Sequence, residues 1–391
     1  MSFAAVTPPL ARERTGGDTD NMSSANVKRV LLYRLGSLGD HLVALPSYRL
    51  VRRAFPEAEC RLVTSLPVNR KAPAAEAVLG GTGLVEGYMA HASGERNPWV
   101  LLRLAWQILR WRPDVLVYLA GARGESIAVR DNIFFRLCGI RRRIGIPLTA
   151  ELQRNRVIEP PSWALPGTPW FEEEGQRLAR CIAELGDAAL DDPESWTPAL
   201  SEEERAEGQR LLEPLGGAPF FAFSLGTKVQ ANQWGVERWQ ELMARVAAEW
   251  PGYGLAIVGA GDEFEISEAV AATWRSVPGA GPALNCCGAA APRVSAAILE
   301  HAVMFLGHDS GPAHMAASVG TPVLGVFSAR VPPGVWVPHG KHVRVVLHWV
   351  DCGGCVLDTC IVQGKKCILS IGVDEVMVAF REHAASVGLT R

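Results

Sequence analysis

The sequence lacks three features that would define whole classes of protein. No run approaches the roughly 18 consecutive apolar residues of a membrane-spanning helix, so we expect a chain that does not cross a bilayer. The formal net charge is only −2, which gives no overall attraction to nucleic acid. The opening segment lacks the apolar core of a signal peptide, and we therefore expect a cytoplasmic protein with nine reduced cysteines.

Hydrophobic material is plentiful, however. The chain has 391 residues, of which 48% are hydrophobic and 20% charged, enough to form two ordinary domains. Residues 1–27 are rich in turn-forming residues, so we predict a disordered tail and leave open whether Met1 or Met22 is the start.

From Lys28 onward, short β-rich runs alternate with helical stretches. "RVLLYR", "CRLVTS", "VLVYLA" and "RRIGIP" predict strands, with helices over 98–111 and 126–138 between them. A Pro-, Asp- and Ser-rich stretch around 188–215 interrupts this rhythm, which then restarts. The pattern predicts an α/β fold of two Rossmann-like doubly wound domains, residues 28–200 and 210–391, with a ligand cleft between them and a closing C-terminal helix.

The first motif, "RLGSLGDHLVALPSYR", follows a predicted strand directly. Gly36 and Gly39 permit a sharp turn and a close backbone approach, and Asp40 then lies at the mouth of a helix. Pro46 predicts that this helix is bent or begins late. Two interpretations fit Asp40, since an acid at this position either caps the helix or takes part in chemistry.

The second motif, "FLGHDSGPAHMAASVGTPVLGVFS", also joins a strand to a helix. Asp309, Ser310 and Gly311 follow the strand, and Pro312 lies in the first turn of the helix. Small residues at such a turn leave backbone N–H groups exposed, which suits a diphosphate. His314 fits either a binding role or simple packing.

These two motifs, together with the tail "CGGCVLDTCIVQGKKCILSIGVDEV", resemble glycosyltransferase family 9, which contains the ADP-heptose:lipopolysaccharide heptosyltransferases. The resemblance covers residues 28 to about 385. It implies the GT-B fold, with an acceptor-binding N-terminal domain and a C-terminal domain that binds the nucleotide-sugar. It also implies inverting, metal-independent transfer, for which we expect no cofactor, with Asp40 as the general base.

The resemblance further implies the two substrates and the residues that hold them. The donor is ADP-heptose or another nucleotide-sugar, and the acceptor is a lipopolysaccharide core or another cell-surface glycolipid or oligosaccharide. No nucleic acid is expected, and peripheral contact with the inner membrane is left open. The expected donor-binding residues are Ser224, Thr227, Lys228, Glu263, Asp309, Ser310, Gly311 and His314, and the expected acceptor-binding residues are Gly36, Ser37, Gly39 and Arg123.

The middle of the chain departs from the family pattern. Related heptosyltransferases have a Lys-x-Trp-Pro element, whereas this chain reads "SLGTKVQANQWGVERW", with Asn232 in place of the lysine and Gly235 in place of the proline. Lys228 is a candidate to replace the missing cation. In "VGAGDEFE", Phe264 occupies the place of the third glycine of a dinucleotide fingerprint, which weakens a nicotinamide or flavin interpretation.

Three further features allow two interpretations each. The cysteines Cys352, Cys355, Cys360 and Cys367 either bind zinc or pack as thiols. "NPWVLLRLAWQILRWRPD", with its tryptophans and arginines, either covers the sheet, which we favour, or lies on a membrane surface. Arginines near Arg123 and in "RRR" at 141–143 either receive an anionic acceptor or form a solvated face.

Three alternatives to a glycosyltransferase remain at this point. The same two-domain fold serves nucleotide-sugar epimerases, since a fold does not determine a function. A dinucleotide oxidoreductase is disfavoured by the interrupted glycine pattern. A non-catalytic donor-binding module is suggested by the missing lysine.

Overall fold

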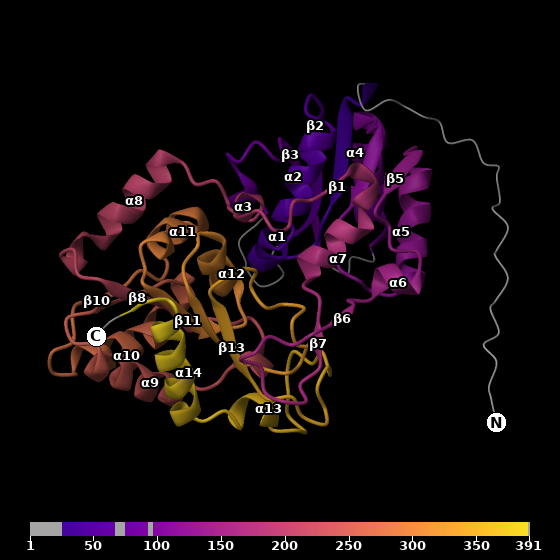
Figure 1. Ribbon diagram of the computed structural model, residues 1–391. Coiled ribbons are helices and arrows are strands. Elements are labelled where there is room, and N and C mark those ends of the chain that lie inside the picture. Colours follow the sequence, from indigo (N-terminus) through magenta and orange to yellow (C-terminus); the bar gives the residue numbers. More distant parts are fainter. Residues whose placement is uncertain (1–25, 67–74, 93–96, 390–391) are drawn as a thin grey trace, which may run out of the picture.

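The computed structural model describes residues 26–66, 75–92 and 97–389. The predicted tail, with Met22, lies outside these residues except for its last two positions. Two parallel sheets organise the chain, one in each of two lobes (Figure 1). The α/β class predicted from the alternating pattern is therefore confirmed.

The first lobe contains a five-stranded sheet in the order β3-β2-β1-β4-β5, and all of its pairings are parallel. Its strands are β1 (Arg29–Tyr33), β2 (Glu59–Leu66), β3 (Gly87–Ala92), β4 (Val115–Tyr118) and β5 (Arg142–Ile144). Its helices are α1 (Leu38–Leu42), α2 (Leu45–Ala54), α3 (Glu76–Leu79), α4 (Pro98–Trp111) and α5 (Glu125–Leu137).

Every residue of the inner strand β4 is buried, because helices cover both faces of this sheet. Leu45 and Tyr48 of α2 belong to the core on one face, and Ile108 of α4 and Phe135 of α5 belong to the core on the other. The predicted break at Pro46 is confirmed, since α1 ends at Leu42 and α2 has Pro46 in its first turn.

A connecting region leads to the second lobe. It comprises α6 (Ala150–Gln153), the antiparallel pair β6 (Val157–Ile158) and β7 (Trp170–Phe171), α7 (Glu174–Cys181) and α8 (Glu202–Leu212). α7 packs against α2 of the first lobe, whereas α8 packs against α11 of the second. We propose a domain boundary between residues 200 and 210, near the start of α8.

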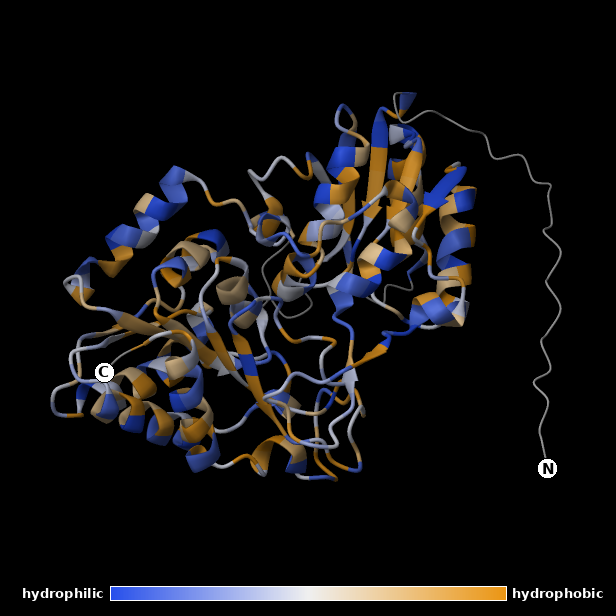
Figure 2. Ribbon diagram, viewed as in Figure 1, coloured by the Kyte–Doolittle hydropathy of each residue, from blue (hydrophilic) through white to orange (hydrophobic). Residues whose placement is uncertain are grey.

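The second lobe contains a six-stranded parallel sheet in the order β10-β9-β8-β11-β12-β13. Its strands are β8 (Phe220–Ser224), β9 (Gly254–Ile257), β10 (Ala283–Asn285), β11 (Met304–His308), β12 (Val323–Phe327) and β13 (Val343–Leu347). Its helices are α9 (Val236–Glu249), α10 (Phe264–Arg275), α11 (Pro292–Glu300), α12 (Gly311–Ser318), α13 (Lys366–Leu369) and α14 (Val373–Ser386). The strands of both sheets include the most hydrophobic segments of the chain (Figure 2).

The two lobes touch through helices that begin at the carboxyl ends of their central strands. α1 follows β1, α12 follows β11, and α1 and α12 pack against each other. Arg293 of α11 adds a polar link, because its Nη1 donates to the carbonyl oxygen of Val78 in the first lobe at 3.1 Å. No helix within the described ranges combines the length and apolarity needed to cross a membrane.

Candidate active site

A cavity of about 550 Å³ lies where the carboxyl ends of the two sheets face each other. This volume is typical of a site for a ligand of nucleotide size. The first lobe contributes three of the predicted residues to its lining, Ser37, Gly39 and Asp40. The second lobe contributes all eight predicted donor-binding residues: Ser224, Thr227, Lys228, Glu263, Asp309, Ser310, Gly311 and His314.

Two glycines allow α1 and α12 to approach each other closely at the floor of this cavity. A Cβ atom at Gly311 would lie 2.6 Å from Cδ2 of Leu38, so any side chain at residue 311 would force Leu38 to shift. A Cβ atom at Gly39 would lie 3.2 Å from Cδ2 of His314. The glycines of the two motifs therefore allow Asp40 and His314 to line the same cavity.

Asp40 caps its own helix and also lines the cavity. The backbone N–H of Ser37 donates to Asp40 Oδ2 at 2.8 Å, and the Ser37 hydroxyl donates to the same oxygen at 3.2 Å. Asp40 Oδ1 lies 3.8 Å from Nη2 of the fully buried Arg34, and 29% of the Asp40 side chain is exposed. The cap fixes one carboxylate oxygen and leaves the other beside a positive charge and the cavity.

Gly36 lies behind Asp40 and does not line the cavity. Its φ of +137° is one that side chains rarely adopt, and a Cβ atom there would lie 2.2 Å from Cγ of Asp40. The sequence motif assigned Gly36 to the acceptor, whereas the structure places it against the Asp40 carboxylate.

The end of β8 and the start of α12 each present an unpartnered polar group to the cavity. Ser224 Oγ and Ser310 Oγ are both buried and have no hydrogen-bond partner within the described part of the chain. A buried polar group without a partner lowers the stability of the fold unless a ligand or water hydrogen-bonds to it. Together with the free N–H groups at the beginning of α12, they form a region suited to an anionic ligand.

Burial shifts the titration of the two ionisable side chains at this helix start. Burial raises the pKa of Asp309 to about 6, although the charge of Arg330 and a hydrogen bond from Asn232 act in the opposite direction. Burial also lowers the pKa of His314 to about 4, although the charge of Asp40 acts to raise it. His314 is therefore a neutral imidazole at pH 7.

A buried histidine holds the loop that follows β8. His308 Nδ1 donates to the carbonyl oxygen of Leu225 at 3.0 Å, so its Nε2 is an acceptor. That atom accepts from the Trp234 N–H at 3.0 Å and from Trp239 Nε1 at 2.9 Å. Both ends of the loop that carries Thr227 and Lys228 are thus tied to β11. No motif in the sequence around His308 indicated this role.

Asn232, which replaces the family lysine, has a structural place in this loop. It is 3% exposed, its Nδ2 donates to the Asp309 carbonyl oxygen at 3.3 Å, and its Oδ1 accepts from the Ser328 hydroxyl. Positive charge at the cavity comes instead from two other lining residues, Lys228 and Arg330. Partial desolvation lowers the pKa of Lys228, whereas the nearby charge of Asp40 acts to raise it.

Arg330 and Trp336 are lining residues that the sequence motifs missed. Arg330 is held by Asp358, whose Oδ1 lies 2.7 Å from its Nη2, and by the Leu357 carbonyl oxygen. It follows β12, and the rule that ligands bind at the carboxyl ends of strands would have found it. Trp336 packs edge-on to His314, with ring centroids 6.3 Å apart.

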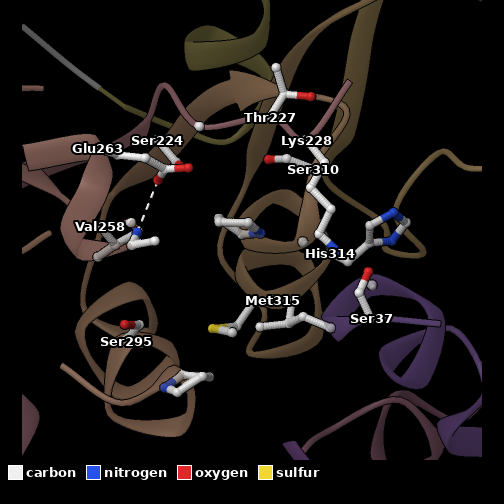
Figure 3. A pocket seen from close by; sticks show the side chains of 18 of the residues that line it. Ser37, Ser224, Thr227, Lys228, Val258, Glu263, Ser295, Ser310, His314 and Met315 are labelled. Atoms are coloured by element: carbon white, nitrogen blue, oxygen red, sulfur yellow. Dashed lines mark hydrogen bonds between the residues drawn. The ribbon is translucent and has the colours of Figure 1, made fainter. Parts of the chain in front are cut away.

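Glu263 lies on the far side of the cavity from Ser37 (Figure 3). Its Oε2 accepts from the Ala260 N–H at 3.0 Å, so this carboxylate also caps the short helical turn Gly261–Glu263. A Cβ atom at Gly226 would lie 2.0 Å from its Oε1. A side chain at residue 226 would therefore displace the Glu263 carboxylate from this position.

Arg123 does not line this cavity. Its Nη2 donates to Asp131 Oδ2 at 3.0 Å and to the hydroxyls of Tyr118 and Tyr33 at 3.2 and 3.3 Å. This network ties the loop after β4 to α5 and to β1. Acceptor binding by Arg123 stays a prediction. The contacts in the structure show that this side chain holds the loop after β4 in place.

The C-terminal cysteines Cys352, Cys355, Cys360 and Cys367 are free thiols. Among the described residues, no group of three or more His, Cys, Asp and Glu side chains is arranged to hold a metal ion. The arrangement gives no support to the zinc interpretation.

The two lobes bring an acid and a helix start into a common cleft, an arrangement that suits an anionic ligand such as a nucleotide. The model of glycosyltransferase family 9 (heptosyltransferase) matches residues 176–366. Lipopolysaccharide heptosyltransferase 1 of Pseudomonas aeruginosa is 24% identical over 344 residues, which cover 86% of this chain and 88% of that protein. The chain belongs to glycosyltransferase family 9 and is a glycosyltransferase.

Solved structures agree on the fold. The glycosyl transferase family 9 protein of Veillonella parvula matches with a TM-score of 0.66 at 16% identity, covering 92% of this chain and 98% of that chain. ADP-heptose lps heptosyltransferase II of E. coli matches with a TM-score of 0.58 at 16% identity, over 92% and 99% of the two chains. E. coli heptosyltransferase WaaC with ADP-2-deoxy-2-fluoro heptose matches with a TM-score of 0.56 at 17% identity, over 91% and 100%. The expected GT-B fold is confirmed.

Proposed function

We propose that this protein is an inverting, metal-independent heptosyltransferase that transfers heptose, or a similar sugar, from ADP-heptose or another nucleotide-sugar. The acceptor is a lipopolysaccharide core or another cell-surface glycan. The observation that carries the proposal is the shared lining of one cavity by Asp40 from the first lobe and by Ser310 and His314 from the second.

Asp40 acts as the general base in this proposal. Its Oδ2 is occupied by the Ser37 N–H and hydroxyl, so Oδ1 is the atom available to take the proton from the acceptor hydroxyl. The deprotonating oxygen attacks the anomeric carbon of the donor from the side opposite the nucleoside diphosphate. The bond to the diphosphate breaks as the new glycosidic bond forms, and the configuration inverts.

The second lobe stabilises the departing diphosphate. The start of α12 supplies backbone N–H groups, and the Ser224 and Ser310 hydroxyls gain the partners they lack. Lys228 and Arg330 supply positive charge from two other loops at the rim of the same cavity. Neutral His314 can donate or accept a hydrogen bond beside the transferring sugar without adding charge.

The nucleoside part of the donor lies towards Glu263 in this proposal. Gly226, Gly259 and Gly288 also line this side of the cavity, where the base or the ribose would lie. Glu263 lines this side of the cavity, and its carboxylate is assigned to a ribose hydroxyl.

The test has two parts, donor binding and transfer. Donor binding is measured as a rise in the thermal unfolding midpoint with ADP-, GDP-, UDP- and dTDP-sugars, because a ligand that binds only the native state stabilises it. Transfer is measured with the best donor and a deacylated core oligosaccharide. Asp40→Asn should lower kcat by at least ~100-fold while it leaves the donor-induced shift unchanged.

The outcomes separate the alternatives. Turnover of the donor without any acceptor would instead favour a nucleotide-sugar epimerase. A donor-induced shift with no transfer to any acceptor would indicate a donor-binding module. No shift with any nucleotide would overturn the proposed function, and an active Asp40→Asn variant would remove Asp40 from the role of base.

A further inference from the structure

The helix over 98–111 is apolar on both of its sides. Leu104, Ile108 and Trp111 of α4 are buried against the sheet, so the interpretation as a covering helix is confirmed. The opposite side nevertheless carries four exposed apolar side chains at steps of three and four residues. These are Trp99, Leu102, Trp106 and Leu109, with exposed fractions of 78%, 58%, 62% and 46%.

The neighbouring helix α5 continues this exposed apolar surface. Val129, Ile133 and Leu137 follow one another at steps of four residues and are 46%, 52% and 76% exposed. α4 and α5 share one core on the same face of the sheet and lie on the same side of the first lobe (Figure 1). We call the seven exposed side chains of α4 and α5 the outer apolar surface.

Positive charge flanks the outer apolar surface. α4 and α5 together contain four arginines, Arg103, Arg110, Arg130 and Arg136, and only two acids. One of those acids, Asp131, is buried and paired with Arg123 and Arg130, and the other, Glu125, begins α5. The Arg110 guanidinium also lies 5.9 Å from the Trp106 ring centroid, which is within the range of a cation–π contact.

We propose that the outer apolar surface docks the protein onto an anionic lipid bilayer. Tryptophan, leucine and flanking arginine form the composition by which a helix lies in the head-group region of such a membrane. A second copy of the chain is a poorer partner, because a twofold contact would bring the same arginines against each other.

The orientation of the surface fits the proposed function, on which this last step rests. α4 follows β3 and α5 follows β4, so both helices begin at the carboxyl edge of the sheet, where α1 with Asp40 also begins. A lipid-linked acceptor in the same bilayer would extend its sugars towards this edge. Docking would thereby hold the enzyme beside its acceptor and raise the local acceptor concentration.

Vesicle sedimentation of the full chain tests the docking. The protein should bind phosphatidylcholine vesicles that contain phosphatidylglycerol and should bind phosphatidylcholine alone much more weakly. Trp99→Ser/Trp106→Ser should lower the partition constant at least ~10-fold. Arg103→Gln/Arg110→Gln should lower it about fivefold per arginine, with a weaker dependence on salt. The thermal unfolding midpoint and the donor-induced shift should stay unchanged in both variants.

Ile361→Ser/Val362→Ser is the matched apolar control, because these two side chains of the second lobe are 80% and 93% exposed. It should bind vesicles as the unaltered chain does. Unchanged binding by the Trp variant, loss of binding by the control alone, or no binding by the unaltered chain would overturn the docking surface. A dimer in sedimentation velocity that the Trp variant dissociates, without vesicle binding, would assign the surface to a second copy. Vesicle binding with no donor-induced shift would leave the docking standing and overturn the proposed function.

Discussion

At the scale of single residues, Asp40 shows that a helix cap and a reacting group need not be alternatives. One carboxylate oxygen accepts from the Ser37 N–H, and this bond orients the other towards Arg34 and the cavity. The sequence indicated both interpretations of Asp40 but could not show that one prepares the other. That relation depends on Gly36, whose missing side chain makes room for the carboxylate.

Gly36→Ala should therefore impair catalysis more than donor binding. The added methyl group would lie 2.2 Å from Asp40 Cγ, so the carboxylate must move. We expect kcat to fall at least ~30-fold, because small displacements of a catalytic group are costly. The donor-induced thermal shift should be retained in the same preparations.

Gly252→Ala is the control for backbone strain alone, since Gly252 has a φ of +80° and nothing lies within 4 Å of an added Cβ atom. Both variants should lose about 1 kcal/mol of stability from the positive φ. Equal activity in the two variants would contradict the positioning role of Gly36.

At the scale of secondary-structure elements, hydrophobic periodicity predicted most strands and helices well. The helices expected over 98–111 and 126–138 correspond to α4 and α5. β3 was not predicted, because "GYMAHA" mixes small, polar and apolar residues without a clear period. Leu45, Tyr48 and Val51 of α2 follow one another at steps of three residues, and all three are buried.

The beginning of α12 is the element whose function depends most on unsatisfied groups. Ser310→Ala removes a buried hydroxyl that has no protein partner in the described chain, so the free energy of unfolding should change by no more than ~0.5 kcal/mol. Donor affinity should fall about 10-fold if this hydroxyl binds the diphosphate. Isothermal titration with the nucleotide-sugar and chemical denaturation measure the two effects.

Ser318→Ala is the control on the same helix. Its hydroxyl donates to the Met315 carbonyl oxygen at 2.8 Å, so its loss affects the helix rather than the ligand. Donor affinity should stay unchanged in this variant. A stability loss in Ser310→Ala with unaltered donor affinity would instead make its hydroxyl a structural group.

At the scale of the whole molecule, buried histidines couple stability to pH. Burial lowers the pKa of His41 to about 3 and the pKa values of His308, His314 and His383 to about 4. Each is protonated in the unfolded chain below its ordinary pKa of about 6.5 but stays neutral in the folded chain. Asp309 acts in the opposite direction, since its raised pKa lets the folded chain bind a proton first.

Stability should therefore be complete above pH ~6.5 and fall as the pH decreases towards 4. Each histidine contributes a slope of about 1.4 kcal/mol per pH unit, and Asp309 offsets one of them below pH 6. Urea denaturation at several pH values measures the slope. His383→Leu should reduce the slope by about one proton. A stability independent of pH over this range would contradict the buried neutral state of the histidines.

The sequence by itself determined the α/β class, the two-domain alternation and the two glycine motifs, because periodicity and turn chemistry are local properties. Tertiary structure decided which groups share a site. Leu38 meets Gly311 and Gly39 meets His314 across about 270 positions of sequence, and no local pattern encodes such a contact. It likewise decided that Arg123 pairs with Asp131, that Arg330 lines the cavity and that one side of α4 stays exposed. These outcomes depend on how elements from separate parts of the chain pack, and packing follows from the shape and volume of every neighbour at once.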